Sequence, residues 1–78
     1  MSRGITANQR KALEQMAREP ERWFRAGEIE GVAPQAAGAS LKGLYKRGLV
    51  NRAVLEARTS AGYRITRAGL WELQHGSA

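Results

Sequence analysis

Apolar residues recur at helical spacing in three stretches of the chain and alternate with polar residues in a fourth. The clearest helical stretch precedes Gly48. Leu41 and Leu44 are three residues apart and Tyr45 follows at i+4, which predicts one apolar stripe on a helix. Lys42 and Lys46 fall on the other side of the same helix. We therefore predict an amphipathic helix with an apolar side toward the protein and a basic side toward water.

Gly48 marks the end of this helix. It occupies the position at which helices commonly end in a left-handed residue, and only glycine adopts that conformation at little cost. The next residue, Leu49, is then placed to contact Leu44, as in a Schellman motif. A strand is expected to begin immediately, over 49–55.

The N-terminal part predicts a helix with defined ends. Thr6 and Gln9 have the spacing of a capping box, and Pro20 ends the helix near Arg18 or Glu19, because the residue before proline avoids helical geometry. Its inner side is expected to carry Leu13, Met16 and Ala17.

Shorter elements follow. The aromatic segment 23–25 predicts a stub of strand, and 26–30 a short helix that Gly31 stops. Pro34 suits the first position of the next helix, where its missing N–H costs nothing. Ala33 would then be the N-cap residue, which is a poor choice because its side chain accepts no hydrogen bond.

After Gly48 the period becomes that of a β-hairpin. The small polar segment 57–61 predicts a turn, and 62–66 predicts a strand with Tyr63 and Ile65 on one face and Arg64 on the other. The buried face of the first strand stays open at this point. Val50, Arg52 and Val54 lie on one face of the strand, and Ala53 and Leu55 lie on the other, so apolar residues occur on both faces. A bulge or a strongly twisted strand pair would allow both sets to be buried.

Thr66 is expected to cap a last helix in which Leu70 and Leu73 face inward. Trp71 lies about 100° away from Leu70 and off this inward stripe. Two roles for Trp71 are open: packing on the first helix, or a homodimer contact that also involves Leu70.

Composition and charge restrict the class of protein. The 78 residues predict a single small domain over 5–75, with disordered tails at 1–4 and 76–78. The net charge is +6, and it is uneven. Residues 1–34 carry six basic and five acidic side chains, whereas residues 35–78 carry seven basic and two acidic ones. A localised excess of positive charge favours a polyanionic partner.

The sequence argues against catalysis and against metal binding. It holds no cysteine and no aspartate, and its single histidine, His75, stands near the end of the chain. A catalytic triad with Asp, a thiolate nucleophile and a cysteine or histidine metal site are therefore not expected, nor is a cofactor. The chain has no long apolar run and no leader-like start, which predicts a cytoplasmic protein without a membrane partner.

The order helix, strand stub, short helix, helix, hairpin, helix resembles the winged helix-turn-helix. Segment 25–29 is similar to the opening of the first motif helix, 41–52 to a recognition helix entering the wing, and 63–70 to the wing return and final helix of MarR- and PadR-like bacterial and phage regulators. The resemblance covers about Thr6 to Gln74. It implies a small α+β domain, mainly α, with a three-helix core, a β-hairpin wing and a short C-terminal helix. It also implies that the domain is a small transcriptional regulator that binds double-stranded DNA.

On this interpretation the helix that starts at Pro34 enters the major groove. Its free side is expected to carry Gln35, Ala39, Lys42 and Lys46, with Ala36 and Gly43 flanking them. Gln35 is the first candidate for reading an adenine edge and Ser40 the second, while the lysines hold phosphates. On the hairpin side the candidates are Arg52, Arg58, Arg64 and Arg67, opposed only by Glu56. Arg58 lies near the tip, where an arginine would either enter a minor groove or hold a phosphate of the backbone.

Other functions fit part of the same pattern. The basic side of the helix would also suit an ordinary solvated surface, and winged helices also serve as protein-interaction modules. Binding of RNA or of a single strand would use Trp23, Phe24 and Tyr63 for stacking, but in so small a domain we expect these rings in the core.

Overall fold

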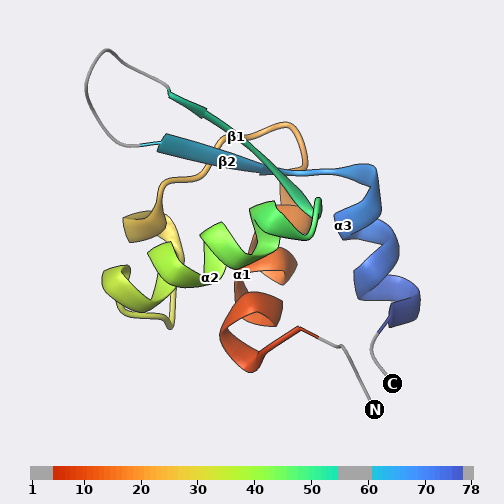
Figure 1. The fold of residues 1–78 in the computed structure, drawn as a ribbon, viewed down its shortest axis with the longest axis horizontal. Helices are drawn as coiled ribbons and strands as arrows, with labels where there is room; N and C mark the ends of the chain where they lie inside the picture. The colour runs from red at the N-terminus through yellow and green to blue at the C-terminus, as the bar shows by residue number, and fades with distance from the viewer. Residues whose placement is uncertain (1–4, 55–60, 77–78) are drawn as a thin grey trace.

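Three helices and an antiparallel β-hairpin make up the described part of the chain (Figure 1). The computed structural model describes residues 5–54 and 61–76. In chain order the elements are α1 (Ala7–Arg18), the 3₁₀ turn η1 (Ala26–Glu28), α2 (Pro34–Lys46), β1 (Val50–Val54), β2 (Ala61–Ile65), α3 (Arg67–Trp71) and one turn of π-helix, η2 (Glu72–Gly76). The expected α+β architecture, mainly helical, is confirmed.

Helix α1 begins and ends where the sequence predicts. The Gln9 N–H donates to Thr6 Oγ1 at 3.1 Å and the Thr6 N–H donates to Gln9 Oε1 at 2.9 Å, so the capping box is complete. Leu13 and Met16 are fully buried. They belong to the same apolar cluster as Leu41 and the other buried side chains of α2, against which α1 packs.

Helix α2 has a weak start and a strong end. No side chain caps its N-terminus at Ala33. At its C-terminus the Leu49 N–H donates to the Leu44 carbonyl and the Gly48 N–H to the Tyr45 carbonyl, both at 3.0 Å, and Gly48 has φ +79°. This is the predicted Schellman motif, and it is confirmed.

Two local predictions need correction. The short helix expected over 26–30 is only the 3₁₀ turn η1, because Ile29 already has extended dihedral angles and its side chain is buried in the core. Tyr45 is 48% exposed rather than part of the buried stripe. It lies about 100° from Leu44 on the helix, which places it on the flank between the buried and the solvated faces.

The hairpin register settles which face of β1 is buried. Val50 pairs with Ile65 and Arg52 with Tyr63, in unbroken antiparallel register. Directly paired residues share a face, so Arg52 lies on the side of Tyr63 that faces the core. Val50 is 1% exposed and Val54 is 59% exposed, because β1 leads away from α3 and leaves the core behind (Figure 1). The burial of β1 therefore requires no bulge. The predicted turn at 57–61 falls mostly outside the described residues.

The strand stub predicted at 23–25 exists as a single bridge. Phe24 and Tyr63 exchange both backbone hydrogen bonds, at 2.7 and 2.8 Å. The segment after α1 thereby lies beside β2 on the edge that β1 leaves open. Both rings are buried, at 4% and 5% exposure, so the prediction that they belong to the core is confirmed. The same prediction is wrong for Trp23, which is only half-buried and lies outside the core cluster.

Helix α3 packs closely on the junction between α2 and β1. Its first turn is capped, since Thr66 Oγ1 accepts from the Gly69 N–H at 3.1 Å. Gly69 is buried, and a Cβ there would overlap the Leu49 carbonyl oxygen. Leu70 and Leu73 are half-buried against the core, as expected. In residues 5–54 and 61–76 no helix has the length and apolar character needed to cross a bilayer.

Candidate nucleic-acid interface

Helix α2 presents one polar face to solvent. Gln35, Ala39, Lys42 and Lys46 are all exposed, as the spacing predicts. The opposite face is buried and consists of Ala37, Ser40, Leu41 and Leu44. The two faces follow from a step of about 100° per residue, which sets positions i, i+4, i+7 and i+11 on one stripe.

Ser40 does not belong to the exposed face. It is 8% exposed, on the side of α2 that packs into the protein. Its expected place as a lateral base-reading residue is therefore wrong. The reason is angular: Ser40 precedes Leu44 by four residues, so it lies almost directly above a fully buried side chain.

The flanking small residues are partly covered by the protein itself. Ala36 and Gly43 are half-buried. A Cβ on Gly43 would lie 2.5 Å from Nε2 at the end of the Gln9 side chain, so this position faces α1. Gly43 therefore serves helix packing, and it adds little to the solvated face.

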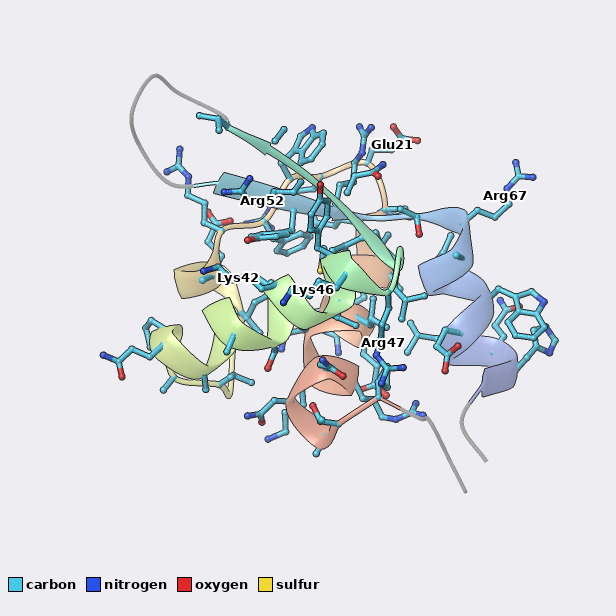
Figure 2. The ribbon with its side chains drawn as sticks, in the orientation of Figure 1. Glu21, Lys42, Lys46, Arg47, Arg52 and Arg67 are labelled. Carbon is cyan, nitrogen blue, oxygen red and sulfur yellow. The ribbon has the colours of Figure 1, made fainter. Side chains whose placement is uncertain are left out.

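The hairpin arginines lie on two different sides. Arg52 is exposed on the side of β1 that faces α2. Arg64 lies on the opposite side, where its guanidinium carbon is 4.5 Å from the centroid of the Trp23 ring. Arg67 projects from the start of α3, beyond the C-terminal end of α2 (Figure 2). Arg58 falls outside the described residues.

Figure 2 shows how the remaining cations are arranged. Lys42 and Lys46 project from α2, and Arg52 reaches out from β1 on the same side of the drawing. Arg52 shares the face of β1 from which Val50 packs into the core, and β1 contacts α2, so the three side chains lie along one side of the molecule. We call this surface the basic face and define it by Gln35, Ala39, Lys42, Lys46 and Arg52.

Acidic side chains are kept away from the basic face. The six described glutamates are Glu14, Glu19, Glu21, Glu28, Glu30 and Glu72, and none belongs to α2 or to the hairpin strands. The ion pairs of Arg10 with Glu14 and of Arg22 with Glu19 and Glu28 lie in the N-terminal half. Within residues 5–54 and 61–76, no carboxylate pairs with Lys42, Lys46 or Arg52. Their charge is therefore available to an external anion.

A small hollow lies elsewhere, between α1 and η1. Its volume is about 150 Å³ and charged side chains of both signs line it, among them Arg22, Glu19 and Glu28. Arg22 also stacks on the Phe24 ring at 4.4 Å. Arg22 pairs there with Glu19 at 3.1 Å and with Glu28 at 3.6 Å, which partly neutralises the hollow. The described residues hold no cluster of histidine or carboxylate side chains suited to a metal ion.

The two residues considered for a dimer contact differ in exposure. Leu70 is half-buried against its own core, whereas Trp71 is 59% exposed. The Trp71 ring contacts the His75 ring in a tilted arrangement, with 4.7 Å between the ring centroids. Trp71 is thus an exposed apolar side chain on the far side of α3 from the core.

Sequence reasoning missed Gln15, which ties α1 to the segment before α2. Gln15 Nε2 donates to the Glu30 carbonyl at 2.7 Å, and the Glu30 N–H donates to Gln15 Oε1 at 2.8 Å. A glutamine on a helix gives no local signal for such a contact, because its partner is fifteen residues away.

No family model, curated protein or solved structure matches this chain.

Proposed function

We propose that this protein binds double-stranded DNA as a winged-helix domain, with α2 in the major groove and β1 beside the adjacent backbone. One observation carries the proposal: Lys42, Lys46 and Arg52 border one exposed surface that has no described carboxylate. Duplex DNA carries a high density of negative charge, which such a surface neutralises. The major groove is wide enough to accept an α-helix.

The arrangement of elements supports this mode of binding. A strand bridge at Phe24 joins β2 on the edge opposite to β1, and α2 leads directly into β1 through Gly48. This is the order expected from the resemblance to the winged helix-turn-helix. With α2 in the groove, the hairpin lies against the flanking backbone.

The residues of the basic face divide into two roles. Gln35 is exposed near the N-terminal end of α2, where its amide can donate to and accept from an adenine edge. Ala39 is the exposed small side chain one turn further on, and it lets the helix lie close to the bases. Lys42, Lys46 and Arg52 contact phosphates, which sets the position of the domain.

Arg64 and Arg67 take a smaller part in this arrangement than the sequence suggested. Arg64 is held over Trp23 on the other side of the hairpin, and Arg67 projects beyond the end of α2. Bound as a small regulator at an operator, the domain would act by position, excluding or recruiting other proteins.

The salt dependence of binding tests this proposal. Fluorescence anisotropy with a labelled mixed-sequence duplex should give a log affinity that falls linearly with log salt. Three phosphate contacts predict a slope of about −3, since each contributes about −0.9. Lys46→Ala should flatten the slope by about one unit and weaken all duplexes alike.

Lys11 supplies a matched control for Lys46→Ala. It is exposed on α1 and lies outside the basic face. Lys11→Ala removes the same charge and should leave the slope nearly unchanged. Equal losses in the two variants, or an affinity independent of salt, would show that the basic face is not the binding surface.

A protein-interaction role is the second candidate, and exposed Trp71 favours it. An NMR titration with the duplex separates the two functions. Shifts confined to 35–46 and 50–54 support DNA binding, whereas an unchanged spectrum at low salt supports the interaction module.

A further inference from the structure

The side-chain amide of Gln15 makes two hydrogen bonds with the backbone of Glu30, in the connection before α2. A neighbouring strand would make the same two bonds with one residue. Gln15 satisfies both the N–H and the carbonyl of Glu30, at 2.8 and 2.7 Å. A side-chain amide can make this pair because it carries a donor and an acceptor in one plane. The result is a fixed link between the middle of α1 and the backbone four residues before Pro34.

The N-terminal end of α2 lacks a side-chain cap. Ala33 supplies no side-chain cap, and Pro34 lacks an N–H. Gly31, with φ +79°, is exposed, as are Ala33 and Pro34. Apart from the Gln15 link, the connection is held by the buried side chain of Ile29 and the half-buried side chain of Val32. The first turn of α2 is also held by the fully buried side chain of Ala37 and by its contact with η1, and Gln15 adds hydrogen bonds to the backbone of the connection that leads into it.

The opposite end of α2 is fixed independently. The Schellman hydrogen bonds at Gly48 and Leu49 hold it to the start of β1. Lys46 is at this end, whereas Gln35 is about 16 Å away along the helix, at the end that follows the Gln15–Glu30 link. Reading a base edge requires a side chain placed to within about 0.5 Å, while attraction to phosphates tolerates larger shifts.

We propose that Gln15 is a positioning residue for sequence discrimination: by fixing Glu30 it orients the start of α2 and so places Gln35 against the base edge. The inference rests on the proposed DNA-binding function. In this proposal Gln15, a residue of α1 that contacts no DNA, affects the discrimination between DNA sequences. It does not affect the overall affinity for DNA.

The test uses Gln15→Met in the full-length chain. Methionine keeps the length, the neutral charge and the helix propensity of glutamine but makes neither hydrogen bond. Gln74→Met is the control, because Gln74 is an exposed glutamine outside α1 and α2. The probes are the tightest duplex selected by the wild type from a random library and a scrambled duplex of the same composition.

For Gln15→Met we expect discrimination between the two duplexes to fall on the order of tenfold, as when a bidentate base contact is lost. Affinity for the scrambled duplex and its salt slope should stay as in the wild type. Amide hydrogen exchange should speed up at Glu30 and at Ala37, whose N–H donates to the Ala33 carbonyl, but not at the end of α2. Gln15→Glu, which still accepts from the Glu30 N–H, should lose less of that protection.

The outcomes separate the inference from its premise. Unchanged discrimination in Gln15→Met, or equal losses on both duplexes, overturns the role of Gln15 while DNA binding stands. Wild-type protein that binds neither duplex overturns the proposed function, and the role of Gln15 in DNA reading falls with it.

Discussion

Gly48 offers a direct measurement of what the end of α2 contributes to stability. Its φ of +79° lies in the left-handed region, and a Cβ added there would meet no atom within 4 Å. Gly48→Ala therefore introduces conformational strain without a clash, at a cost of about 1–2 kcal/mol. Alanine also restricts the unfolded chain, which offsets about 0.4–1 kcal/mol of that cost.

The same substitution at a second glycine, Gly27, serves as a reference, because glycine-to-alanine restricts the unfolded chain equally at both positions. Gly27 also has open space around its Cβ position, but its φ is not positive. Gly27→Ala should therefore be neutral or slightly stabilising. The difference in unfolding free energy between Gly27→Ala and Gly48→Ala then isolates the strain and should be about 1–2 kcal/mol. For a domain of this size it corresponds to about 5–15 °C in Tm.

Urea and thermal unfolding followed by far-UV circular dichroism measure this difference. Gly48→Asn should recover part of the loss, because asparagine tolerates the left-handed region better than alanine does. Equal stability of Gly27→Ala and Gly48→Ala would refute the Schellman end on which the α2–β1 junction is built.

Three further results are expected. Gly69→Ala should lower the unfolding free energy by about 1–3 kcal/mol, because the new methyl group overlaps the Leu49 carbonyl and Ile65. This loss outweighs the better helix propensity of alanine, and a variant more stable than the wild type in urea unfolding would contradict the packing. Lys42→Ala should leave Tm within about 2 °C of the wild type, since the Lys42 side chain is exposed and unpaired among the described residues. The same variant should bind the duplex more weakly in fluorescence anisotropy. A large fall in Tm would show that Lys42 has a structural role. Trp71→Ala should abolish any concentration-dependent association seen by sedimentation velocity, whereas monomers in both proteins would exclude a self-association role for the exposed ring.

The features that the sequence determined by itself are local ones. The Thr6 capping box, the glycine end at Gly48, the cap at Thr66 and the alternation of Tyr63 and Ile65 each depend on residues within about four positions of one another. The exposed stripe of α2 followed in the same way from its period. Local backbone geometry fixes these features whatever packs against them.

Tertiary structure decided everything that depends on a distant neighbour. Ser40 is buried because α1 and the rest of the core cover its side of α2, and the sequence period alone placed it at the edge. Arg52 and Arg64 took opposite sides only once the pairing of β1 with β2 was fixed. The contact of Gln15 with Glu30 joins residues fifteen positions apart. Such contacts form because packing brings separate segments together. The residue pattern within one segment does not indicate which other segment packs against it.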